Sequence, residues 1–98
     1  MADQPSGGHQ FTNITAAGSV VVSNTGVALK RVILGGTYVG TVEFYNSATV
    51  AGTAAANNIY TVGLPLLNQY KSIDINANAR NGLVYVATGT PTMTFAFD

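Results

Sequence analysis

Short runs of strand-forming residues, repeatedly interrupted by turn-forming residues, are the feature of this sequence that most constrains its fold. From Phe11 onward, runs rich in Val, Ile, Thr, Tyr and Phe alternate with clusters of Gly, Asn, Ser and Pro. Turn signals recur roughly every 8–12 residues, the spacing of a sandwich or barrel. We therefore predict an all-β fold, an antiparallel, jelly-roll-like β-sandwich of about eight strands. The expected strands are 11–15, 19–23, 28–34, 39–46, 57–62, 70–76, 82–88 and 92–97.

Alternation of apolar and polar residues predicts which side chains enter the core. Val42 and Phe44 should point inward with Glu43 outward, because successive side chains of a strand lie on opposite faces. The same pattern places Ile73, Ile75, Met93, Phe95 and Phe97 inward and Asp74 and Thr94 outward. Residues 19–23 (SVVVS) and 32–34 (VIL) do not alternate. These two segments are either covered on both faces or present apolar side chains to a partner.

Outside the expected strands, the sequence predicts an N-terminal arm, a turn and a long loop. Residues 1–10 contain Pro, Ser and Gly without an apolar anchor, which predicts an extended N-terminal arm before a single domain at 11–98. Gly35, Gly36 and Thr37 predict a turn. Residues 48–57 lack a helical apolar stripe and predict a long loop with at most one helical turn.

Charge is scarce in this chain. Only 8% of its 98 residues are charged, against about 25% in ordinary soluble domains, and the formal net charge is zero. Such a surface favours association with other proteins. Four basic residues are too few for a nucleic-acid footprint, so no nucleic-acid partner is expected. No apolar run approaches the ~20 residues of a membrane span, so no membrane partner is expected either.

Residues with catalytic or metal-binding chemistry are few. His9 is the only histidine, cysteine is absent, and the acidic residues are Asp3, Glu43, Asp74 and Asp98. Glu43 and Asp74 are expected outward on strands, as solvated charges rather than a hydrolytic pair. Residues 74–78 (DINAN) begin like a calcium loop, but the required Gly and Glu are missing at positions six and twelve. We therefore expect no enzyme, no metal site and no cofactor.

Two further residue groups admit a second interpretation. Exposed aromatic rings stack on sugars in some sandwich proteins, so Tyr38, Tyr45 or Tyr60 would serve an alternative function as a carbohydrate-binding module for host glycans. Tyrosine is equally enriched at protein interfaces.

Lys30 and Arg31 are adjacent on one expected strand and should point to opposite faces, which argues against a basic patch.

The order of the strand and turn motifs resembles a known family type. The runs are 25–34 (TGVALKRVIL), 40–46 (GTVEFYN), 80–89 (RNGLVYVATG) and 92–97 (TMTFAF). Together they look like the small β-sandwich virion proteins of tailed bacteriophages, in particular head decoration or cement proteins. The low charge of this chain departs from that type.

The resemblance implies a non-enzymatic subunit on the capsid exterior of the virion, commonly a homotrimer, that bridges neighbouring major capsid protein subunits. A tail- or fibre-associated adaptor of the same virion is the alternative. Edge strands and extended arms are natural attachment modes. We expect contacts with the capsid or between subunits from residues 1–15, which include the arm, from the 35–38 turn and from the 48–58 loop. The expected contact residues are His9, Phe11, Gly36, Thr37, Tyr38, Ala51, Ala55 and Asn57.

Overall fold

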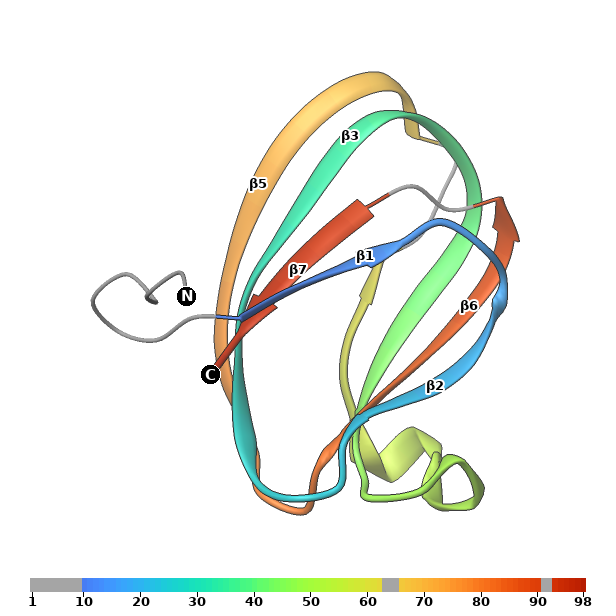
Figure 1. Ribbon diagram of the computed structural model, residues 1–98. Coiled ribbons are helices and arrows are strands. Elements are labelled where there is room, and N and C mark those ends of the chain that lie inside the picture. Colours follow the sequence, from blue (N-terminus) through green and yellow to red (C-terminus); the bar gives the residue numbers. More distant parts are fainter. Residues whose placement is uncertain (1–9, 63–65, 91–92) are drawn as a thin grey trace, which may run out of the picture.

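Two antiparallel sheets packed against each other form the protein (Figure 1). The computed structural model describes residues 10–62, 66–90 and 93–98. Its strands are β1 (Gln10–Ile14), β2 (Gly18–Ser23), β3 (Val27–Asn46), β4 (Asn58–Val62), β5 (Leu66–Ala79), β6 (Leu83–Thr90) and β7 (Met93–Phe97).

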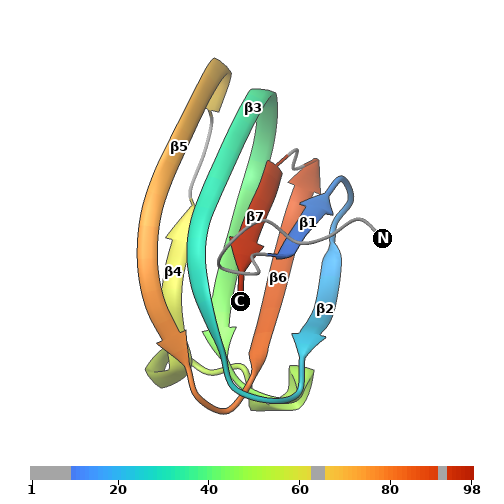
Figure 2. The same cartoon turned by 60° about the vertical axis from the view of Figure 1, so that its left-hand side comes forward.

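Strand β3 belongs to both sheets. Its first part pairs with β5 and β7, which gives sheet A the order β1-β7-β3-β5. From Val39 onward it pairs with β6 and β4, which gives sheet B the order β2-β6-β3-β4. Counted once in each sheet, β3 makes eight strands in two sheets of four, the arrangement of a jelly roll. The predicted antiparallel β-sandwich is confirmed. Figure 2 shows β1 and β2 along one side of the sandwich and β4 and β5 along the other.

The predicted turn at 35–37 is wrong, because β3 runs through it without reversing. Gly35 pairs with Tyr70 and Gly36 with Gln69, and a register shift follows before Tyr38 pairs with Leu66. Two glycines and a bulge let a strand bend sharply, so the chain passes from sheet A to sheet B while remaining extended. Gly40 lies just after this crossing at φ +123°, and a Cβ there would overlap the carbonyl oxygen of Thr88.

The core lies between the sheets and follows the predicted alternation. Val42, Phe44 and Phe95 are fully buried, and Glu43 and Asp74 point outward as expected. Phe95 is central: its ring centroid lies 5.1 Å from that of Phe44. Tyr85 and Phe97 complete an aromatic cluster around it, with centroids at 5.9 and 5.8 Å. Offset and edge-to-face contacts of this kind add stability beyond the burial of area.

The long loop after β3 forms two short 3-10 turns, at Val50–Gly52 and Ala55–Asn57. The predicted loop is thus confirmed, with one turn more than expected. Other strand limits also shift: β5 is longer at both ends than the expected 70–76, and β1 begins at Gln10. The rest of the expected arm, 1–9, lies outside the described residues.

Candidate interaction surfaces

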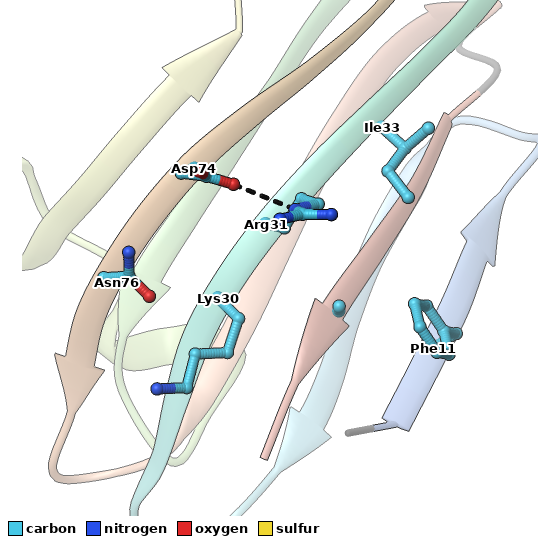
Figure 3. A pocket seen from close by; sticks show the side chains of 7 residues that line it. Phe11, Lys30, Arg31, Ile33, Asp74 and Asn76 are labelled. Carbon is cyan, nitrogen blue, oxygen red and sulfur yellow. Dashed lines mark hydrogen bonds and ion pairs between the residues drawn. The ribbon is translucent and has the colours of Figure 1, made fainter. Parts of the chain in front are cut away.

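The outer face of sheet A carries an exposed aromatic ring beside charged groups. Phe11 is 59% exposed and pairs with Ala96 of β7, which in turn pairs with Arg31 of β3. Arg31 pairs with Asp74 of β5, so one row of side chains crosses the whole sheet. A depression of about 390 Å³ lies on this face (Figure 3). Its lining residues are Phe11, Lys30, Arg31, Ile33, Asp74, Asn76 and Ala96. This surface is called the Phe11 face below.

A bulge in β3 brings Lys30 and Arg31 to the same face. Opposite β7, Leu29 and Arg31 pair with the consecutive residues Phe97 and Ala96, so Lys30 is an extra residue without a partner in that ladder. Leu29 remains fully buried, while Lys30 and Arg31 both line the depression (Figure 3). The prediction that they point to opposite faces is wrong, because a bulge interrupts the alternation on which it was based.

Two ion pairs hold the charged side chains of this face in place. The Arg31 Nε donates to Asp74 Oδ1 at 2.9 Å. Lys30 Nζ lies 4.0 Å from Asp98 Oδ1. The side chains of Arg31 and Asp74 are more than half exposed, so their pair contributes only about 0–1 kcal/mol to stability. Its effect is to present charge of both signs beside the apolar part of the depression.

The outer face of sheet B is more apolar than that of sheet A, and its side chains are more buried. Val21 of β2 pairs with Val84 of β6, and Val84 pairs with Tyr45 of β3. Val84 is fully buried although it points away from the main core. The Tyr45 hydroxyl donates to Glu43 Oε1 at 3.0 Å. Burial raises the pKa of Tyr45 above its ordinary value, and the hydrogen bond and the negative charge of Glu43 raise it further.

The loop at 47–57 is held by its own polar groups. Buried Ser47 accepts from the Thr49 amide and donates to the Thr49 carbonyl, at 3.2 and 2.7 Å. The Asn57 side-chain amide donates to the Gly52 carbonyl at 2.8 Å, so this predicted contact residue is used within the loop. Ala51 and Ala55 are exposed and available to a partner.

The predicted contact residues do not gather on one surface. Phe11 lies on the outer face of sheet A, and the loop with Ala51 and Ala55 lies at one end of the sandwich (Figure 1). The crossing of β3, which contains Gly36, Thr37 and Tyr38, lies at the opposite end. These three residues belong to a strand rather than a turn. His9 lies outside the described residues.

The tyrosines proposed for glycan stacking do not form an exposed platform. Tyr45 is only 9% exposed, and Tyr60 is half-buried against the core. Tyr38 lies where β3 crosses between sheets. Among the aromatic side chains that the structure describes, the exposed one is that of Phe11.

The expected outward carboxylates lie on different faces. Glu43 is on the part of β3 in sheet B, whereas Asp74 is on β5 in sheet A, so the two do not flank a common site. Asp74, Asn76 and Asn78 lie along β5 and not in a loop. Within the described ranges, no group of three or more His, Cys, Asp or Glu side chains is placed to hold a metal ion.

No helix in the described part of the chain is long and apolar enough to cross a membrane. Comparison with known proteins gives no match to a family model, to a curated protein or to a solved structure.

Sequence reasoning detected two of the exposed apolar sites but not their arrangement. Val20, Val21 and Ile33 belong to the two segments that fail to alternate, and all three are exposed, so these segments are not covered on both faces. The Arg31–Asp74 pair was missed. Its partners are 43 residues apart, and only the β3–β5 register brings them together.

Proposed function

We propose that this protein is a structural virion protein, a capsid cement or decoration subunit that binds the outer shell and bridges neighbouring major capsid protein subunits. Two features support this function: the jelly-roll fold and the resemblance of the strand motifs to small phage head proteins. The scarcity of charge favours association with other proteins, although it departs from the decoration-protein type. Jelly rolls recur in viral capsid proteins, although they also occur in lectins and cupins.

The observation that carries the proposal is the Phe11 face. Its exposed aromatic ring adjoins Ile33 and buried Ala96, with the Arg31–Asp74 pair next to them. Aromatic residues and arginine are enriched where proteins meet, and contacts of this kind contribute most of the binding energy. Phe11 also immediately follows the expected arm. We propose that this face and residues 1–10 attach the subunit to the shell.

A small neutral sandwich suits this role physically. A protein bound at the joints between shell subunits adds buried contact area where the shell is loaded from inside. Many copies on one particle turn a modest contact into a strong collective effect. The subunit associates with further copies of itself as a homo-oligomer in the same assembly.

Co-sedimentation with heads that lack the protein tests this function and this surface. Wild type should pellet with the heads, and Phe11→Ser should weaken binding at least about tenfold, because an anchor at an interface centre contributes more than 1.4 kcal/mol. Val86→Ser is the matched control: Val86 is half-buried and pairs with outward Glu43 in sheet B, away from the Phe11 face and the 48–58 loop, so its binding should stay within about twofold. Deletion of residues 1–10 should also weaken attachment. Equal binding by wild type, Phe11→Ser and the deletion would refute the proposed surface.

The two alternative functions predict different results in the same experiment. A tail- or fibre-associated adaptor should pellet with purified tails and not with heads. A carbohydrate-binding module should bind a sugar array as an isolated domain and lose binding on Tyr60→Ala. The burial of Tyr45 makes this last function the least supported.

A further inference from the structure

We propose that the free edge of β2 pairs with β2 of a second copy of this chain, in an antiparallel, two-fold arrangement centred on Val21. This inference gives the self-association of the proposed function a two-fold form, in place of the homotrimer that the resemblance implies, and it does not depend on the capsid.

The edge of β2 lacks charge and proline, two of the usual protections against pairing, and its irregularity is a bulge between Val21 and Ser23 in the ladder with β6. β2 is the last strand of sheet B, and no other strand in the described residues pairs with its free edge. Val20 and Val21 are adjacent on it, and each is 41% exposed. Residues 18–23 (GSVVVS) contain neither a charged residue nor a proline to oppose a second strand. An apolar edge with unpaired backbone groups is a template for another strand.

The other three edges are less suited to pairing. The β5 segment contains Lys71 and Asp74, and charges on an edge discourage pairing. β1 and β4 are uncharged, but each is only five residues long. Phe11 is the large exposed apolar residue of β1, and β4 has none. β2 alone combines six residues with two adjacent exposed valines.

The sequence of β2 selects a second copy as the occupant. Residues 19–23 read Ser-Val-Val-Val-Ser in both directions. In an antiparallel pair centred on Val21, that residue faces its own copy. Once the bulge at Val22 straightens, Val20 faces the partner's Val22, and Ser19 faces the partner's Ser23. Every position then meets a side chain of its own kind, and no charges oppose each other across the axis.

The pairing would also extend an apolar row that exists in each sheet B. Val21 pairs with buried Val84, which pairs with Tyr45. Val21 of two copies would join these rows into one row across an eight-stranded sheet. A two-fold contact uses both free edges, so it closes at two copies. The chain turns at each end of β2, at Gly18 and at Ser23, whose hydroxyl donates to the Thr25 carbonyl at 2.9 Å.

Disulfide trapping of the free protein tests this geometry. The chain has no cysteine, so Val21→Cys would introduce a single thiol that faces its own copy across the axis. We expect oxidised Val21→Cys to form a covalent dimer in high yield. Ile33→Cys, which is exposed to a similar degree on the outer face of sheet A, should give only a few per cent of dimer from random collision.

Sedimentation equilibrium supplies an independent measurement. Val21→Lys places like charges opposite each other and should raise the dimer dissociation constant at least about a hundredfold, since such a juxtaposition costs several kcal/mol. Ile33→Lys adds the same charge elsewhere and should leave the constant within about threefold. Far-ultraviolet circular dichroism verifies that each variant is folded.

A wild-type monomer at all concentrations, a trimer insensitive to Val21→Lys, or equal cross-linking at positions 21 and 33 would overturn the β2 pairing. None of these results bears on attachment to heads, which co-sedimentation measures separately.

Discussion

Gly40 occupies the point where β3 has just entered sheet B, directly opposite Gly89 of β6. Its φ of +123° is unfavourable for any side chain, and a Cβ would overlap the Thr88 carbonyl oxygen. Gly18 is a matched control, because its φ is +147° but no atom lies within 4 Å of the position its Cβ would take.

We predict that Gly40→Ala lowers the free energy of unfolding by about 2–4 kcal/mol and Gly18→Ala by about 1–2 kcal/mol, because only the first adds a steric overlap to backbone strain. Urea denaturation followed by circular dichroism measures both. Equal losses for the two variants would show that the close approach of β3 and β6 at Gly40 is wrong.

Tyr45 makes a prediction about alkaline pH. Its pKa is raised in the folded protein by burial, by the hydrogen bond to Glu43 and by the charge of Glu43. The folded state therefore retains the phenolic proton at pH values where the unfolded chain has lost it. The contribution of Tyr45 to stability is complete below the unfolded pKa of about 10 and is lost as pH rises through the higher folded pKa.

The free energy of unfolding should accordingly fall more steeply above pH 10 in wild type than in Tyr45→Phe, which cannot ionise. The other tyrosines contribute equally to both proteins, including Tyr85, whose pKa is raised by burial. Parallel pH dependences of the two proteins would contradict this environment for Tyr45.

At the scale of elements, β3 separates what the sequence could predict from what it could not. The alternation at Val42, Glu43 and Phe44 correctly predicted which side chains enter the core. The glycines at 35 and 36 were interpreted as a reversal, because glycine pairs serve turns and bends equally well. Only the pairing of both with β5 distinguishes the two, and such long-range pairing leaves no local signal.

A proline substitution tests the continuity of β3. Proline has no N–H for a ladder and is poorly tolerated inside a sheet, whereas a turn often accepts it. Gly36→Pro should therefore lower the free energy of unfolding by more than about 2 kcal/mol, and by more than Gly36→Ala, which keeps the N–H. Thermal or urea denaturation measures the difference. If Gly36→Pro were as stable as wild type, the continuous strand would be contradicted and the predicted turn at 35–37 would be favoured.

The candidate surfaces were only partly predictable for a related reason. Broken alternation singled out the valines of β2, and Phe11 was predicted as a contact residue because it lies in the 1–15 segment. The charges beside Phe11 were not, because a bulge at Lys30 and the register between β3 and β5 place them there. A bulge follows from the pairing of two strands, so a single strand's sequence does not reveal it.

For the whole molecule, the central claim is that a sandwich with few charged residues, no net charge and an apolar face functions by association. Two independent surfaces support this claim. The Phe11 face lies on the outside of sheet A, and the free edge of β2 belongs to sheet B. A subunit with both could contact the shell through one and another copy through the other.

The most direct measurement of this claim is the thermal disruption of heads that lack the protein, with and without the purified protein added back. The account predicts that the added protein raises the disruption temperature in a saturable manner, and that the Phe11→Ser variant raises it less. If the purified protein remained a lone monomer and left the disruption temperature unchanged at every concentration, the account would be contradicted.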